Sequence, residues 1–113
     1  MKLAICINFL TNGAYISNSF AQSDYYFIYD MESKELVGKI TNHIKSSIGA
    51  EVFFAQLLIN QGINMLVCGI CGKDAKRLFS EANIILLEHI KGNPGDFIKD
   101  FHINYRNDFI RHT

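Results

Sequence analysis

The chain has 113 residues, of which 49% are hydrophobic and 19% are charged. This length and balance indicate one globular domain and exclude a disordered chain. Eleven basic and eleven acidic residues cancel, so the sequence lacks the excess charge that binds nucleic acid or an anionic membrane. The longest apolar runs, such as Ile84–Leu87, are too short to span a bilayer.

The first ten residues, MKLAICINFL, are predicted to form a strand rather than a signal peptide. Asn8 interrupts the apolar run, and no small-residue cleavage site follows it. The chain also has three cysteines, an odd number. Without an export signal, an odd number favours reduced thiols in the cytoplasm over a disulfide framework.

The first half of the chain is predicted to consist of strands. Lys2–Asn8 is apolar nearly throughout, as in a strand that is covered on both faces. Thr11–Gly13 is typical of a turn, and the polar stretch Tyr15–Asp24 is predicted to be a surface loop. Tyr25–Met31 and Glu35–Thr41 are suited to strands and flank a short polar turn, which predicts a hairpin.

The second half alternates between helical and strand patterns. After Gly49 a helix is predicted that ends at Gly62, and its apolar face contains Ala50, Phe53, Phe54, Leu57 and Leu58. Buried strands are predicted at Met65–Cys68 and Ile84–Leu87, with a helix between them. The apolar stripe of that helix is Ala75, Leu78, Phe79 and Ala82. Pro94 is predicted to open a short last helix, whose inward residues are Phe97, Ile98 and Phe101.

This order of elements predicts an α/β fold with three layers, α/β/α, on a five-stranded mixed sheet. Helix–strand–helix–strand order favours parallel neighbours, while the hairpin adds an antiparallel member. Residues 1–103 are predicted to be one domain, and residues 104–113 a C-terminal tail. In such sheets ligands bind beyond the carboxyl ends of the parallel strands, where the turn Cys68–Gly72 and the loop after the first strand are expected to emerge.

The turn Cys68–Gly72 is the most informative stretch for function. It joins a buried strand to the first turn of a helix, where free backbone N–H groups and the helix dipole stabilise an anion or a thiolate. A C-x-x-C motif in this place can chelate iron or zinc, or cycle as a dithiol, because a helix amino terminus lowers the pKa of a thiol.

One C-x-x-C motif supplies only two ligands, whereas an iron–sulfur cluster needs four. A partner chain, Cys6, His43 or exogenous ligands would have to complete the set, which favours labile binding. A structural interpretation is equally open, because free cysteine is among the most buried residue types. In that case Cys68 is the buried end of a strand, Cys71 fills the turn, and Cys6 is a core residue in the middle of its strand.

Three stretches resemble the motifs of the dinitrogenase iron–molybdenum cofactor biosynthesis family. VCGICGKDAKRLFSEANI resembles its strand, G-x-x-G-P-x-A turn and following helix, and AQLLINQGINMLVCG is similar to its A-x-x-L-x-x-x-G-V-D-x-V-I-x-G pattern. ISNSFAQSDYYFIYD is similar to its V-S-x-H-F-G-x-A-x-x-F-x-I-x-D pattern. The spacing is consistent over residues 1–103. Three positions depart from the family pattern: Ser19 replaces a histidine, Ala21 replaces a glycine, and Lys73 replaces a proline.

The resemblance implies a ribonuclease-H-like fold and a role in binding or carrying an iron–sulfur or iron–molybdenum cluster, or its precursor, for delivery to a partner protein. The residues that it places at a cofactor are Ser17, Ser19, Phe20, Gly69 and Gly72. The expected metal ligands are Cys71 first, then Cys68 and His43.

No catalytic residue is predicted. A nuclease with this fold would need a carboxylate on the first strand to hold divalent metal ions, and Lys2–Asn8 contains none. Neither a Ser/His/Asp arrangement nor a phosphate-binding glycine motif can be recognised. We therefore expect a non-enzymatic protein. Two alternatives stay open: a ligand-free interaction or regulatory module on the same fold, and a dithiol redox protein based on the C-x-x-C motif.

Overall fold

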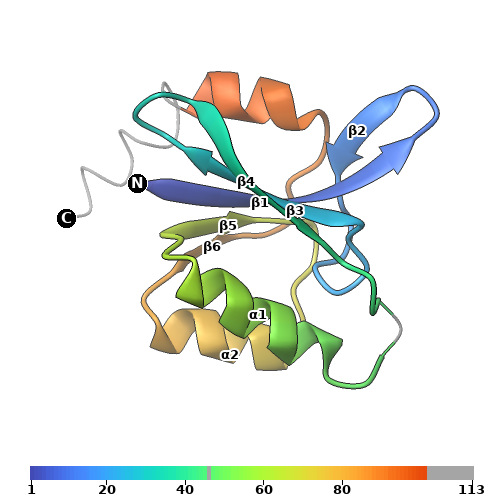
Figure 1. The fold of residues 1–113 in the computed structure, drawn as a ribbon, viewed down its shortest axis with the longest axis vertical. Helices are drawn as coiled ribbons and strands as arrows, with labels where there is room; N and C mark the ends of the chain where they lie inside the picture. The colour runs from blue at the N-terminus through green and yellow to red at the C-terminus, as the bar shows by residue number, and fades with distance from the viewer. Residues whose placement is uncertain (46, 102–113) are drawn as a thin grey trace.

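The computed structural model of the protein describes residues 1–45 and 47–101 (Figure 1). The strands of the first half are β1 (Lys2–Leu10), β2 (Gly13–Ile16), β3 (Tyr25–Asp30) and β4 (Glu35–Thr41). The second half contains α1 (Ala50–Asn60), β5 (Met65–Val67), α2 (Lys73–Glu81) and β6 (Ile85–Leu87). Residues 94–101 are also helical. The predicted tail, residues 104–113, lies outside the described residues.

All six strands belong to one mixed sheet. Its order is β4-β3-β1-β5-β6, and β2 pairs with β1 beside this path. β1 runs parallel to β5, and β5 runs parallel to β6, whereas β1 is antiparallel to both β2 and β3. The apolar run of β1 explains its central place, because the side chains from Leu3 to Ile7 are fully buried. The predicted α/β class with a mixed sheet is confirmed, with six strands in place of the five predicted.

Helices cover both faces of the sheet, which gives the predicted three layers (Figure 1). Alternate residues of β1 face opposite layers. Ala4 and Cys6 pack in the cluster beneath α1 and α2, while Leu3, Ile5 and Ile7 pack in a second cluster. This second cluster includes Phe97, Ile98 and Phe101 from the helical residues 94–101. In the described part of the chain, no helix combines the length and the apolar character needed to cross a membrane.

The sixth strand, β2, corrects the prediction of a surface loop over Tyr15–Asp24. The chain reverses at Thr11–Asn12, so that Tyr15 pairs with Asn8 and Ile16 with Ile7. The sequence signal is weak because β2 has only four residues and begins with glycine and alanine. The remainder of the predicted loop is also largely internal, since Ser17, Phe20 and Ser23 are fully buried.

Phe53 corrects the predicted apolar face of α1. Its side chain is 53% exposed, whereas Phe54 and Leu58 are buried in the cluster against the sheet. Phe53 instead makes an edge-to-face contact with the ring of Phe54, with 5.1 Å between the ring centroids. The helical pattern therefore predicted the helix correctly, but it wrongly included Phe53 in the buried face.

Candidate functional site

Two segments that are far apart in the sequence meet at one end of the sheet: residues 17–20, which follow β2, and residues 69–72, the turn between β5 and α2. Ser19 and Ile70 form a parallel bridge between them. Three backbone N–H groups donate across this junction: Gly69 to Ser17 O (2.8 Å), Ile70 to Asn18 O (2.7 Å) and Phe20 to Ile70 O (2.9 Å). The structure thus brings together the two stretches in which cofactor-binding residues were predicted.

Gly69 permits the close approach of the two segments. A Cβ atom at this position would overlap the backbone carbonyl of Asn18. Because the obstacle is backbone and not the end of a flexible side chain, it has little room to move. The glycine is therefore required by the contact between the segments, whether or not a ligand binds there.

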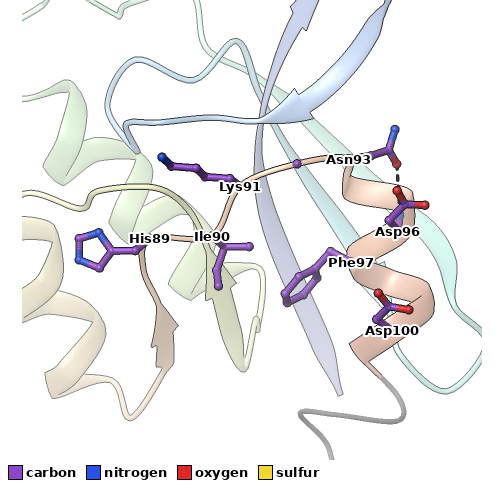
Figure 2. A pocket seen from close by; sticks show the side chains of 8 residues that line it. His89, Ile90, Lys91, Asn93, Asp96, Phe97 and Asp100 are labelled. Atoms are coloured by element: carbon purple, nitrogen blue, oxygen red, sulfur yellow. Dashed lines mark hydrogen bonds between the residues drawn. The ribbon is translucent and has the colours of Figure 1, made fainter.

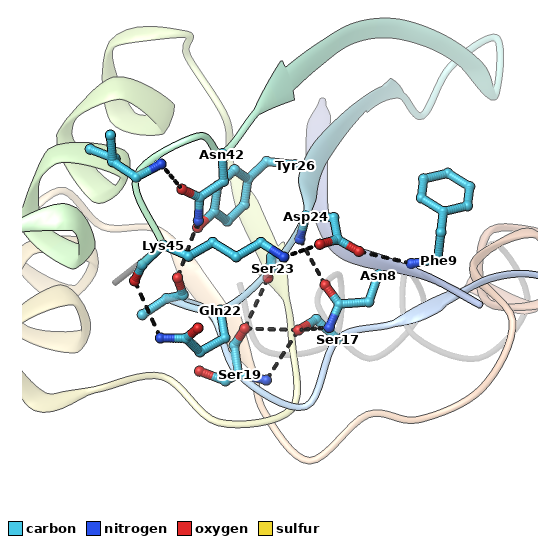
Figure 3. A network of polar contacts seen from close by, with 12 residues as sticks. Asn8, Phe9, Ser17, Ser19, Gln22, Ser23, Asp24, Tyr26, Asn42 and Lys45 are labelled. Atoms are coloured by element: carbon cyan, nitrogen blue, oxygen red, sulfur yellow. Dashed lines mark hydrogen bonds and ion pairs between the residues drawn. The ribbon is translucent and has the colours of Figure 1, made fainter. Parts of the chain in front are cut away.

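The buried side chains of Ser17 and Phe20 hold residues 17–20 in place. The Ser17 hydroxyl accepts hydrogen bonds from Asn8 Nδ2 (3.1 Å) and the Ser19 N–H (3.2 Å) and donates to Ser19 O (2.8 Å) (Figure 3). Ser17 is fully buried, as is Phe20, which packs against the rings of Tyr26 and Phe79. Of these predicted residues, the partly exposed Ser19 is the one placed to meet a ligand.

The loop that holds His43 is tied to the same region by polar contacts (Figure 3). Lys45 forms an ion pair with Asp24, and this contact holds the pKa of the Asp24 carboxyl below its usual value. Asn42 donates to Ala21 O at 3.1 Å. His43 itself is exposed and borders two grooves beside β4 and α1, neither of which is lined by Cys68 or Cys71.

The three cysteine thiols lie in a row beneath α1 and α2. Cys6 belongs to β1, Cys68 directly follows the neighbouring parallel strand β5, and Cys71 comes from the turn. The side chain of Cys68 interacts with those of both Cys6 and Cys71. All three cysteines are free, and each is at most 3% exposed. Cys6 is the core residue that the sequence predicted, and the two thiols of the C-x-x-C motif are in contact.

The expectation that the start of the helix lowers the thiol pKa is wrong at this turn. The pKa of Cys71 is raised, first by its hydrogen bond to Cys68 and then by burial. The pKa of Cys68 is raised as well, chiefly by its hydrogen bond to Cys6. Both thiols therefore stay protonated at neutral pH, because burial and the neighbouring thiols disfavour the thiolate.

Two carboxylates that sequence analysis missed stand at the start of α2. Glu88 Oε2 accepts the backbone N–H of Cys71 at 3.0 Å, and Glu88 Oε1 pairs with Lys76 Nζ at 3.0 Å. The carboxylate of Glu51 lies where a Cβ atom of Gly72 would be. These side chains occupy the place in which an anion was expected. Glu88 directly follows β6, and its position at the carboxyl end of a parallel strand could have identified it as a site residue from the sequence. Nothing in the sequence indicated that Glu51 lies near this turn.

The described residues offer a metal few ligands of their own. Within residues 1–45 and 47–101, no group of three or more His, Cys, Asp or Glu side chains is arranged to hold a metal ion. Cys68 and Cys71 form a pair of sulfur donors, the number that one C-x-x-C motif supplies. A cluster bound here would therefore depend on ligands from outside this part of the chain.

A separate cavity of about 410 Å³ lies between residues 89–93, which follow β6, and the helical residues 94–101 (Figure 2). Ile90 and Phe97 give it an apolar part, and Asp96 and Asp100 lie along the helix. None of the predicted site residues lines this cavity. The sequence-based hypothesis therefore concerns the junction of residues 17–20 with residues 69–72 and not this cavity.

Together these features define a small α/β/α domain in which a C-x-x-C turn is fixed against a neighbouring loop at the carboxyl end of parallel strands. The family described as "Dinitrogenase iron-molybdenum cofactor" matches residues 1–104. The chain belongs to this family, which relates to the biosynthesis of the iron–molybdenum cofactor. A comparison with curated proteins gives no match.

Solved structures share the fold. The apo form of the orange protein from Desulfovibrio gigas is 17% identical, with a TM-score of 0.77 over 89% of this chain and 86% of that one. A putative NifB protein from Thermotoga is 23% identical, with a TM-score of 0.75 over 91% and 88%. A putative dinitrogenase from Methanocaldococcus jannaschii is 20% identical, with a TM-score of 0.62 over 89% and 86%. The TM-scores establish a common fold.

Replacing Gly69 with alanine should destabilise the protein because the new Cβ atom would push the two segments apart. We expect a loss of about 1–3 kcal/mol in the free energy of unfolding, the usual range for overpacking. Gly38→Ala is the matched control, since a Cβ there meets Ile28 at an ordinary 3.5 Å. The control should change stability by less than about 1 kcal/mol in urea unfolding. Equal losses of unfolding free energy in the two variants would contradict the close contact between Gly69 and Asn18.

The raised thiol pKa values predict that the protein loses stability in alkaline solution. Below about pH 8.5, the usual pKa of a thiol, folded and unfolded chains both keep the Cys71 proton. Above it only the unfolded chain releases the proton, so the free energy of unfolding falls as pH rises. Between pH 8.5 and 9.5 each such thiol costs about 1 kcal/mol.

Comparison with Cys71→Ser isolates this effect. The unchanged protein should lose about 1 kcal/mol more than the variant over the same pH interval. Urea unfolding at a series of pH values measures both curves. Parallel curves would mean that the Cys71 thiol titrates alike in the folded and unfolded chains.

Proposed function

We propose that this protein binds or carries an iron–sulfur or iron–molybdenum cluster, or its precursor, without catalysing a reaction. Binding would take place at the junction of residues 17–20 with residues 69–72. Cys71 is the first ligand of this proposal and Cys68 the second. Family membership supports a role in cofactor assembly, and the contact between the two C-x-x-C thiols supports a shared ligand at that point.

The observation that carries the proposal is the convergence of sulfur donors at the carboxyl end of β5. Two thiols in contact are a suitable start for a site that binds iron, because thiolates are the usual protein ligands of iron–sulfur clusters. Binding would release the protons of Cys68 and Cys71, since the thiolate is the ligand form. His43 has a weaker place in this proposal, because the grooves that it borders do not reach the cysteines.

Incomplete ligation fits a carrier better than a permanent metalloprotein. Two cysteines leave half of the ligands of a four-ligand cluster to exogenous thiols or to a partner protein. Such a site would load and release its cargo by ligand exchange. The three free cysteines also fit a reducing compartment, so we propose a cytoplasmic location.

A ligand-free interaction module is the second candidate, and the carboxylates favour it. Glu88 accepts the Cys71 N–H, and Glu51 lies against Gly72, so the chain's own acidic groups stand where an anionic cluster would bind. Ser19 in place of the family's histidine points the same way. A dithiol redox role has less support, because the raised pKa values of Cys68 and Cys71 keep the reactive thiolate scarce.

Anaerobic reconstitution with iron and sulfide tests the proposal. The unchanged protein should bind iron and sulfide and develop sulfide-to-iron charge-transfer bands in its visible spectrum. Cys71→Ser should lose the bands and most of the iron. Cys6→Ser is the matched control, because it also leaves two cysteines but keeps the C-x-x-C motif, and it should retain the bands.

Thermal unfolding of each variant shows whether it is folded before loading. A colourless, iron-free protein in all three cases would refute the cluster-carrier proposal and leave the interaction module. Bands that persist in Cys71→Ser would place the cluster elsewhere on the chain.

A further inference from the structure

The two halves of the turn between β5 and α2 are held by different kinds of contact. In the first half, backbone groups bond to backbone on both sides. Gly69 and Ile70 donate to residues 17 and 18, while Cys68 and Gly69 accept from Ile90 (3.2 Å) and His89 (2.6 Å). In the second half, the N–H of Cys71 donates to a side chain, the carboxylate of Glu88.

The Glu88 carboxylate is itself held in place by a cation. Lys76, one turn into α2, pairs with its second oxygen at 3.0 Å. Burial opposes the ionisation of Glu88, but the Cys71 N–H and Lys76 outweigh it and hold the pKa of Glu88 below its usual value. The carboxylate is therefore charged at neutral pH and can bridge the turn and the helix. We call this bridge, from Cys71 through Glu88 to Lys76, the Glu88 contact.

The Cys71 thiol is reached from solvent only if this part of the turn moves. Cys71 is 3% exposed, although the preceding Ile70 is 60% exposed. On the other side of Cys71, Gly72 has no side chain of its own, although the Glu51 carboxylate packs against it and its carbonyl oxygen accepts the Lys76 N–H (2.9 Å). A small rearrangement at residues 71 and 72 would turn the thiol outward while residues 68–70 keep their backbone bonds.

We propose that Glu88 is a positioning residue that keeps the C-x-x-C turn closed over its thiols, and that opening of the Glu88 contact admits ligands to Cys71. The biological role of this opening rests on the proposed function, because a cluster can bind Cys71 only in the open form. The opening itself belongs to the metal-free protein and can be tested without any cluster.

Alkylation of the native, metal-free protein by iodoacetamide, followed by peptide mass spectrometry, measures the access of reagent to each cysteine. Glu88→Ala removes the acceptor of the Cys71 N–H. The rate at Cys71 should rise roughly tenfold to a hundredfold, as expected for loss of a hydrogen bond to a charged group. Glu81→Ala is the control on α2, because its carboxylate is 67% exposed and pairs only loosely with Arg77. It should leave the rate unchanged.

Glu88→Gln separates access from ionisation of the thiol. Glutamine and alanine remove the same negative charge beside Cys71, but glutamine keeps an oxygen that can accept the Cys71 N–H. If Glu88 closes the turn through this hydrogen bond, Glu88→Ala should label Cys71 about tenfold faster than Glu88→Gln. Equal rates in the two variants would overturn the proposal, because the charge alone would then explain the change.

Cys6 serves as an internal reference for global unfolding, since it is fully buried in the centre of the sheet. Its labelling should not accelerate with that of Cys71 in Glu88→Ala, and a parallel rise would overturn the proposal. Should Glu88→Ala not fold, the unchanged protein gives the test in low concentrations of urea. Labelling of Cys71 should then be nearly independent of urea while that of Cys6 rises, and the same dependence at both sites would overturn local opening.

A failed reconstitution with iron leaves these experiments intact. Opening without iron binding would refute the cluster carrier but retain the closing role of Glu88. If the protein binds iron but Cys71 is alkylated at equal rates in Glu88→Ala and Glu88→Gln, the cluster-carrier proposal would be supported and the closing role of Glu88 refuted.

Discussion

The close contact between Gly69 and the carbonyl of Asn18 determines the geometry of the whole site. Because position 69 has no Cβ atom, two backbone segments can lie within hydrogen-bonding distance. That pairing extends the parallel part of the sheet beyond β5 and fixes residues 17–20 beside the C-x-x-C turn. The buried hydroxyl of Ser17 and the ring of Phe20 then hold the loop from beneath. The same residues that suggested a ligand site are thus needed to build it.

This arrangement determines the protonation state of the cysteine thiols. Cys6 lies on β1 and Cys68 directly follows the adjacent parallel strand β5. Both face the same layer, where Cys71, folded back from the turn, completes a row of three. The hydrogen bond to Cys6 and burial raise the pKa of Cys68, and the hydrogen bond to Cys68 and burial raise the pKa of Cys71. In the folded protein the thiols are neutral and buried, and under the proposed function they would become metal ligands only after the turn opens and the protons leave.

The sequence predicted the elements well where a repeating apolar pattern was present. The helices before and after β5, the central β1 and the β3–β4 hairpin all follow from periodicity and from turn residues such as Gly62. The strand β2 was not predicted because its four residues are too few to show the alternation of apolar and polar side chains that indicates a strand. The sequence singled out the turn and the loop that meet in the structure, but not the charges around them, since the position of Glu88 beside Cys71 depends on long-range packing between β6 and the turn. A rule for an isolated helix terminus could not include that carboxylate or the neighbouring thiols.

The central claim is that the turn has a fixed half, held by backbone pairing at Gly69, and a releasable half, held by Glu88. Native-state hydrogen exchange of single backbone amides tests it most directly. After correction for intrinsic rates, the Cys71 amide should exchange at least about tenfold faster than those of Gly69 and Ile70, and through an opening that is insensitive to low urea. Equal exchange at all three amides, with the urea dependence of global unfolding, would show that the turn opens only when the whole protein unfolds.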